Sequence, residues 1–288
     1  MKKTAAFIVA SLLACGVASA QELDATEQAI SEWADAHAED AISLLAETVN
    51  ISSGTMNHEG VRKVGRVMRR ELNAVGLDTE WVEMPPHVER AGHLIGRKDG
   101  DRGKKILMIG HLDTVYEADD AFQSWQRDGR YATGPGTDDM KGGNVVIVYA
   151  LKALQAVGAL EDMPVFVIYT GDEEKTGQPH AISRKHLVDA GQWADIALGF
   201  EGASHADGVD YAVVARRGSA SFTLEVSGRQ AHSSRIFRDD VGACAIFEAA
   251  RILNAFYESV RGEEYLSFNA GTIQGGTNVE YDPSTNRG

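Results

Sequence analysis

The first residues that could do chemistry are a histidine and an aspartate two positions apart, in the segment 110–115 (GHLDTV). They follow an apolar run at 104–109 that predicts a short strand. On extended backbone, residues two apart share a face, so His111 and Asp113 can point into one crevice. This pair suits a metal-bound imidazole whose second nitrogen is held by a carboxylate. Taken alone, it is also compatible with a solvated strand end that has no role.

Acidic residues mark three further places in the chain: Asp138 and Asp139 in the glycine-rich loop 134–143, Asp172, Glu173 and Glu174 after the apolar run 164–169, and Glu201 after the run 195–200. In open α/β sheets, functional residues collect where strands end. Helix capping is an alternative for the aspartate pair, and a solvated turn is an alternative for the acidic triplet. However, three consecutive acids repel one another unless a cation or a proton resolves the charge. Together with His111, these acids have the composition of a metal site.

These motifs resemble, in order and approximate spacing, those of the zinc-dependent exopeptidases and deacylases. That family includes bacterial glutamate carboxypeptidase, acetylornithine deacetylase, succinyl-diaminopimelate desuccinylase and aminoacylase. The matching strings are GHLDTV at 110–115, GPGTDDMKGG at 134–143, DEE at 172–174 and FE at 200–201. The resemblance runs from about residue 25 to the end of the chain. It implies a three-layer α/β/α catalytic domain with an inserted smaller α+β lid and dimerisation domain, and a pair of Zn²⁺ ions.

The resemblance also implies roles for single residues. It assigns the metal ligands as Asp139 bridging both ions, His111 and Glu201 on one zinc, and Glu174 on the other. Asp113 then orients His111. Glu173 is the general base, which activates a zinc-bridging water and returns the proton to the leaving nitrogen. A cis peptide bond between Asp139 and Met140 is implied as well.

A further histidine, His232, follows the segment 219–227. The residues around it predict only a turn histidine. Its position resembles that of the family histidine that stabilises the tetrahedral oxyanion, which in dimeric relatives reaches the active site of the other subunit. The resemblance therefore adds His232 to the catalytic residues and implies a homodimer formed through the lid domain.

The C-terminus departs from the family pattern. Family members continue through the lid and return to the catalytic domain with a late histidine, the last protein ligand of the second zinc, and with contacts to the substrate carboxylate. This sequence ends at 283–288 (PSTNRG). We therefore expect one complete zinc site, a second site that lacks a ligand, and a chain that is a fragment of a longer protein. A short protein that is an inactive or metal-binding remnant is the alternative.

The elements that must position these residues alternate between helices and strands. Helical periodicity covers 25–49 and 58–75, apolar strands cover 104–109, 164–169 and 195–200, and helices at 142–156 and 181–190 separate the strands. Continuous apolar strands between helices predict a sheet covered on both faces, and therefore an α/β fold.

The pattern changes near residue 215. The segments 219–227 and 266–273 alternate polar and apolar residues, as strands with one solvated face do, and a predicted helix at 241–260 lies between them. We therefore expect a catalytic domain at 21–215 and a partial α+β lid domain at 216–288, both incomplete at the C-terminus.

The first twenty residues have the features of a secretory signal peptide. Lys2 and Lys3 precede an apolar run at 4–17, and Ala-Ser-Ala at 18–20 forms a cleavage site. This predicts a periplasmic or secreted protein with no membrane attachment after cleavage, and lipidation at Cys15 is the alternative. Cleavage leaves one cysteine, Cys244, so the mature chain has no intramolecular disulfide.

Composition limits the partners and leaves the substrate open. The 288 residues are 43% hydrophobic and 24% charged, as in an ordinary globular protein, and the net charge of −14 argues against nucleic acid. The family resemblance implies a small peptide or an N-acyl amino acid as the substrate. Export favours a glutamate-carboxypeptidase-like exopeptidase, which cleaves an amide next to a free carboxylate. A deacylase or dipeptidase of the same family is the alternative, and a non-catalytic binding protein, against which Glu173 argues, is the third hypothesis.

Overall fold

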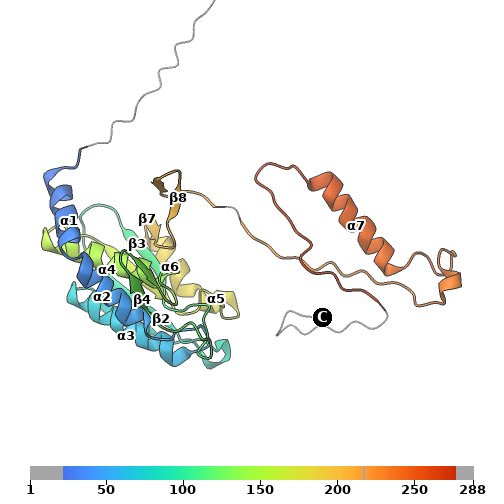
Figure 1. Ribbon diagram of the computed structural model, residues 1–288, viewed down its shortest axis with the longest axis horizontal. Helices are drawn as coiled ribbons and strands as arrows, with labels where there is room; N and C mark the ends of the chain where they lie inside the picture. The colour runs from blue at the N-terminus through green and yellow to red at the C-terminus, as the bar shows by residue number, and fades with distance from the viewer. Residues whose placement is uncertain (1–21, 217, 277–288) are drawn as a thin grey trace, which may run out of the picture. The chain divides into compact units, whose positions relative to one another are not determined.

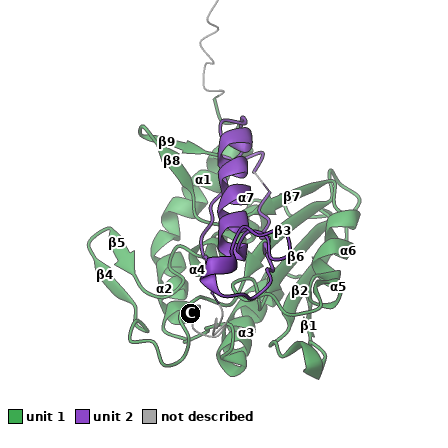
Figure 2. Cartoon of the chain, turned by 90° about the vertical axis from the view of Figure 1, so that its right-hand side faces the viewer, with its two compact units in different colours: residues 1–211 green, residues 212–288 purple. Residues whose placement is uncertain are grey.

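The computed structural model describes residues 22–216 and 218–276. The chain divides into two compact units, residues 1–211 and 212–288, which Figure 2 colours separately. The predicted signal peptide and the alternative lipidation site lie outside the described residues. Among the residues that are described, no helix is both long enough and apolar enough to cross a membrane.

The first unit is built on a five-stranded sheet with the order β1-β2-β6-β3-β7 (Figure 2). Its strands are β1 (Asp78–Val82), β2 (His93–Lys98), β3 (Ile106–His111), β6 (Val165–Thr170) and β7 (Ile196–Gly199). Strand β3 runs parallel to both β6 and β7, whereas β2 is antiparallel to β1 and β6. The three predicted strands are therefore neighbours, and they run in the same direction.

The register brings the ends of these strands to one edge of the sheet. His111, the last residue of β3, lies opposite Thr170, the last residue of β6. Gly199 of β7 pairs with Ile109 of β3, so the chain leaves β7 at the same edge. The loops that carry the predicted site residues therefore begin side by side.

Helices cover both faces of this sheet, as the apolar strands predict (Figure 1). The helices of this unit are α1 (Ala25–Ala36), α2 (Ala38–Val49), α3 (His58–Ala74), α4 (Lys141–Ala156), α5 (His180–Ser183) and α6 (Lys185–Trp193). On one face, Val167 of β6 packs in a cluster with residues of α3 and α4. On the other face, Phe166 and Ile168 pack with Ala190 of α6. Alternate residues of β6 thus belong to different hydrophobic clusters on opposite faces of the sheet, which confirms the α/β prediction.

Two predicted helices are each divided in the structure. The periodicity at 25–49 is shared by α1 and α2, which separate at His37, where φ is −113° and ψ is 14°. The His37 ring stacks on Trp33 with 3.9 Å between ring centroids, and its Nδ1 lies 2.7 Å from the Trp33 carbonyl oxygen. The helix predicted at 181–190 is likewise divided between α5 and α6.

Several strands were not predicted from the sequence. They are β1 and β2 of the central sheet, the hairpin of β4 (Gln126–Asp128) and β5 (Tyr131–Thr133), and the hairpin of β8 (Ser204–Ala206) and β9 (Val209–Tyr211). Strand β1 is a partly exposed edge strand with two acidic residues, and β2 includes a glycine and two basic residues. Neither matches an apolar run. The pairing of β2 with β6, and of β1 with β2, compensates for this weak local signal.

The second unit differs more from its prediction. Its described helices are η2 (Ser233–Arg235), a 3₁₀ turn, and α7 (Ala245–Val260), which begins later than the predicted 241. The predictions of strands at 219–227 and 266–273 are wrong, because neither segment forms a strand within the described residues 218–276. Alternation marks a possible strand face, but a strand also needs a partner for its backbone hydrogen bonds. The Phe222 side chain accordingly remains 93% exposed.

Candidate metal centre and active site

The predicted site residues of the first unit gather at the carboxyl ends of the parallel strands. His111 ends β3 and is followed by Asp113, Asp139 lies just before α4, Glu173 and Glu174 follow β6, and Glu201 follows β7. The sheet register described above aligns three of these loops. Asp139 joins them because α4 packs against β3.

Three of these residues form a donor group that could hold a metal ion. Nε2 of His111 lies 2.9 Å from Oδ1 of Asp139 and 3.6 Å from Oε1 of Glu201. One donor atom from each residue lies within 4.8 Å of the other two. The His111 ring is buried, whereas the side chains of Asp139 and Glu201 are 60% and 44% exposed. One imidazole nitrogen and two carboxylates match the ligands of catalytic zinc, and the exposed side leaves room for a substrate.

The pKa values in this group reflect crowded carboxylates around one imidazole. Burial would lower the pKa of His111, but the hydrogen bond and charge of Asp113, followed by the charges of Glu201 and Glu173, raise it to about 9. Burial and then the charge of Asp139 raise the pKa of Glu174 to about 7. The negative charges of Glu174 and Asp139 therefore repel each other. A bound cation relieves this kind of repulsion, so the electrostatics fit a metal site.

Asp113 is fully buried and connects His111 to the acidic loop. Its Oδ1 lies 3.4 Å from Nδ1 of His111, and its own carbonyl oxygen lies 3.0 Å from the same nitrogen. The backbone N–H groups of Glu173 and Glu174 donate to its two carboxylate oxygens, each at 3.1 Å. Burial would raise the pKa of Asp113, but the hydrogen bond and charge of His111, together with the hydrogen bonds from Thr55 and the Glu173 N–H, lower it below its usual value. One carboxylate therefore orients the imidazole and fixes the loop that carries the predicted base.

The aspartates of the glycine-rich loop do not cap the following helix. Helix α4 begins at Lys141, and its N-cap residue, Met140, makes no side-chain capping hydrogen bond. The capping alternative is therefore wrong.

The peptide bond between Asp139 and Met140 is cis. Lys141 is buried, with its Nζ donating to the Ile51 carbonyl at 2.9 Å, and burial lowers the pKa of Lys141 to about 7.

The first acid of the triplet has a different function from the other two. Asp172 is fully buried, forms an ion pair with Arg184, and accepts a hydrogen bond from the Gly177 N–H at 2.9 Å. A second guanidinium nitrogen of Arg184 donates to the Asp172 carbonyl at 3.0 Å. The cation that resolves this charge is thus a side chain, which sequence reasoning missed because Arg184 lies outside the recognised motifs. The pair closes the loop that positions Glu173 and Glu174.

We expect Arg184→Met to destabilise the protein, because it leaves the buried Asp172 carboxylate unpaired. Removing one partner of a buried ion pair costs about 3–5 kcal/mol. Arg66→Met is the matched control, since Arg66 pairs with Glu59 on the surface and both side chains are largely exposed. That change should cost about 0–1 kcal/mol. Denaturant unfolding of both variants measures the difference, and equal losses would contradict the structural role of Arg184.

A buried histidine supports the same loop from β2. Nδ1 of His93 accepts the Gly171 N–H at 3.2 Å, so its Nε2–H donates to the Ser183 carbonyl, 2.8 Å away. Burial lowers the pKa of His93, which favours this neutral ring. Both ring nitrogens are therefore used in holding the backbone at the start of the acidic loop and at α5.

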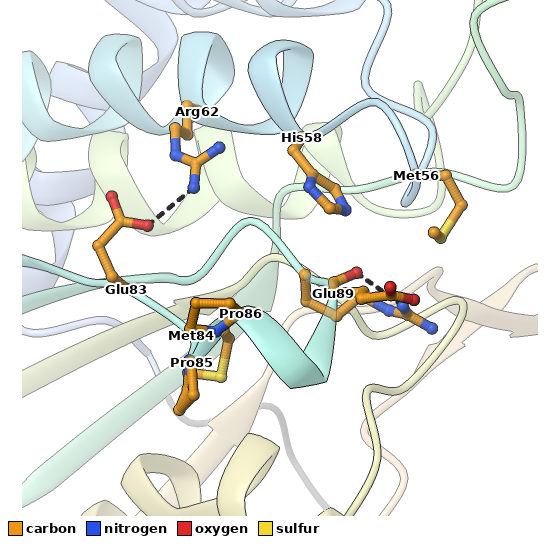
Figure 3. A pocket seen from close by; sticks show the side chains of 9 residues that line it. Met56, His58, Arg62, Glu83, Met84, Pro85, Pro86 and Glu89 are labelled. Atoms are coloured by element: carbon orange, nitrogen blue, oxygen red, sulfur yellow. Dashed lines mark hydrogen bonds and ion pairs between the residues drawn. The ribbon is translucent and has the colours of Figure 1, made fainter.

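A pocket of about 590 Å³ lies next to the acidic loop (Figure 3). Its lining residues are Met56, His58, Arg62, Glu83, Met84, Pro85, Pro86, Glu89 and Arg90. Arg90 Nε donates to the Lys175 carbonyl at 2.6 Å, which joins the pocket wall to the residue after Glu174. None of the predicted site residues lines this pocket.

His232 lies in the second unit, at the start of the turn η2. Its side chain is exposed, and its Nδ1 lies 3.0 Å from the Ser234 hydroxyl. These local contacts belong to the second unit alone. The catalytic role of His232 stays a prediction.

Comparison with known proteins gives one family and a consistent set of relatives. The family model of peptidase family M20/M25/M40 matches residues 107–281. Carboxypeptidase G2 of Pseudomonas sp. (strain RS-16) is 28% identical over 249 residues, which cover 86% of this chain and 57% of that protein. Succinyl-diaminopimelate desuccinylase of Bradyrhizobium sp. (strain ORS 278) is 33% identical over 202 residues, covering 67% of this chain and 51% of that protein.

A solved structure shares the fold. Human carnosine dipeptidase 1 matches with a TM-score of 0.50 and 18% sequence identity, covering 60% of this chain and 40% of that one. Its similarity supports the α/β fold. The chain spans about half the length of the curated relatives it matches.

Proposed function

The chain belongs to peptidase family M20/M25/M40, as its motifs predicted, and from that membership we propose that it is part of a dizinc exopeptidase. The proposed reaction is hydrolysis of an amide bond next to a free carboxylate. Homology to peptidases and desuccinylases indicates a hydrolase. The observation that carries the zinc proposal is the cluster of His111, Asp139 and Glu201, with one donor atom from each within 4.8 Å of the others.

Each residue has a task in this reaction. His111 and Glu201 would hold one zinc ion, Glu174 the other, and Asp139 both. Bound zinc would polarise the amide carbonyl and lower the pKa of water. Asp113 keeps His111 oriented through its second ring nitrogen.

Glu173 is the proposed general base. Asp113 accepts a hydrogen bond from the Glu173 backbone N–H, which holds this residue beside the donor group. The charge of Glu173 contributes to raising the pKa of both His111 and Glu201. Among the described residues, the Glu173 carboxylate has no hydrogen bond or ion pair. It is therefore free to take a proton from water and return it to the leaving nitrogen.

The substrate proposal rests on the relatives and on the predicted export. Carboxypeptidase G2 is named for removal of a C-terminal residue, and the predicted signal peptide favours an extracytoplasmic enzyme of this kind. We also propose a homodimer formed through the second unit, in which His232 would stabilise the oxyanion. An N-acyl-amino-acid deacylase is the second candidate, because several relatives are desuccinylases.

A panel of substrates tests the proposal. The zinc-loaded protein would be assayed with N-acyl glutamates, other N-acyl amino acids and dipeptides, with release of the free amino acid as the readout. We expect hydrolysis that requires a free carboxylate next to the scissile amide and is strongest with glutamate. Preference for the acyl group, with little discrimination among amino acids, would favour the deacylase. Zinc binding without hydrolysis of any substrate would contradict both.

A further inference from the structure

Thr55 donates a hydrogen bond to the buried centre of the site from a distant part of the sequence. Its hydroxyl Oγ1 lies 2.7 Å from Oδ2 of Asp113, and both residues are buried. This hydrogen bond is shorter than the other contacts of the Asp113 carboxylate. The N–H groups of Glu173 and Glu174 lie 3.1 Å from its oxygens, and Nδ1 of His111 lies 3.4 Å away. No motif pairs Thr55 with Asp113.

The backbone around Thr55 is held firmly against the strand end that carries Asp113. The Thr114 N–H donates to the Ser53 carbonyl at 2.9 Å, and Gly54 forms an isolated parallel bridge with Thr114. A Cβ at Gly54 would lie 2.5 Å from Cα of Glu117, so the two backbones approach as closely as glycine permits. The hydroxyl of Thr55 is therefore placed by main-chain contacts before any metal ion binds.

We propose that Thr55 is a positioning residue, which holds the Asp113 carboxylate where it can fix both His111 and the backbone of Glu173 and Glu174. This inference rests on the proposed metal-dependent function. Asp113 has two oxygens and must serve an imidazole and two N–H groups. Because the carboxylate is fully buried, water cannot replace a donor that is lost. Without the hydroxyl, Oδ2 keeps only the Glu174 N–H, and the carboxylate is free to turn away from the geometry that joins the ligand to the loop.

The expected consequence is weaker metal binding and slower turnover with little change in KM. Loss of a hydrogen-bonding partner behind a metal ligand typically lowers metal affinity or activity by about 10- to 100-fold. Thr55 is buried and is not one of the residues that line the pocket in Figure 3, so substrate binding should be largely retained.

Three variants test the inference. Thr55→Val removes the hydroxyl while keeping the shape of the side chain, and Thr55→Ser restores the hydroxyl. Thr48→Val is the matched control. Thr48 is fully buried in α2, and its hydroxyl hydrogen-bonds within the same helix, to the carbonyls of Leu45 at 2.9 Å and Leu44 at 3.3 Å. Zinc affinity would be measured by competition with a chromophoric chelator. Amide hydrogen exchange over residues 171–177 would be followed in the metal-free protein.

In Thr55→Val we expect zinc affinity to fall by about 10- to 100-fold, and the Glu173 and Glu174 amides to exchange faster. Thr55→Ser should restore both properties, and Thr48→Val should change neither. Equal zinc affinity and equal exchange in Thr55→Val and Thr48→Val would overturn the inference. Hydrogen exchange requires neither zinc nor turnover, so it tests the role of Thr55 even if the wild-type protein hydrolyses no substrate. The absence of hydrolysis by the wild-type protein would contradict the proposed function and not the role of Thr55.

Discussion

Replacing Glu173 by alanine should reduce kcat by about 10²–10⁴-fold, the usual contribution of a general base, and leave the zinc content close to that of the wild-type protein. The reason is the division of tasks between two adjacent acids. Burial and the charge of Asp139, the proposed bridging ligand, raise the pKa of Glu174, as expected for a carboxylate that shares a metal site with Asp139. The Glu173 carboxylate has no partner among the described residues and remains free to move a proton.

Glu174→Ala is the contrast for this prediction. It should lower zinc stoichiometry together with activity, because it removes a proposed ligand of the second zinc and leaves the base in place. Metal analysis and steady-state kinetics on both variants distinguish the roles. If Glu173→Ala loses zinc and Glu174→Ala keeps it, the two assignments must be exchanged.

The second large effect is expected from Asp139→Asn. Asp139 lies 2.9 Å from the His111 imidazole and is the proposed ligand of both zinc ions. Loss of a residue that hydrogen-bonds to a metal ligand lowers metal affinity by up to about 100-fold. Loss of Asp139, a proposed ligand itself, should weaken zinc binding by more than that, and hydrolysis should fall with it. The measurement is a zinc titration of the metal-free variant.

Asp138→Asn is the matched control for that experiment. Asp138 is the preceding residue of the same loop, but it is not a member of the donor group. Its substitution removes the same charge at almost the same place. If both variants lost zinc affinity to the same degree, the binding would be explained by general electrostatic attraction. Coordination of zinc by Asp139 would then be contradicted.

The parts of the fold that carry the site could be predicted because their signals are local. Strands β3 and β6 are apolar along their length, and every residue of β6 is buried, so a continuous run identified each strand and its end. The acids and the histidine follow these runs directly. The strand ends were therefore recognised as candidate site segments before the register of the strands was known.

Residues that support the site from a distance could not be predicted in this way. Thr55 reaches Asp113 across 58 positions, and Arg184 reaches Asp172 from α5–α6, without a spacing that marks either contact. His93 is buried between two backbone groups, which composition cannot reveal. These contacts depend on the sheet order and on helix packing, which are tertiary properties.

The second unit illustrates the opposite error. Alternating residues at 219–227 predicted a strand, but the described residues of that unit provide it with no pairing partner. A period of two specifies which side chains share a face and does not specify what the backbone bonds to. Assignments there, including the role of His232, depend on the family resemblance.

The central claim is that His111, Asp139 and Glu201 hold a metal ion on which hydrolysis depends. Zinc titration of metal-free protein, with N-acyl glutamate hydrolysis followed at each addition, tests it most directly. We predict that activity returns in proportion to the zinc bound and that Asp139→Asn recovers neither binding nor activity. Undiminished hydrolysis by the metal-free protein, or zinc binding by Asp139→Asn with wild-type affinity, would contradict the claim.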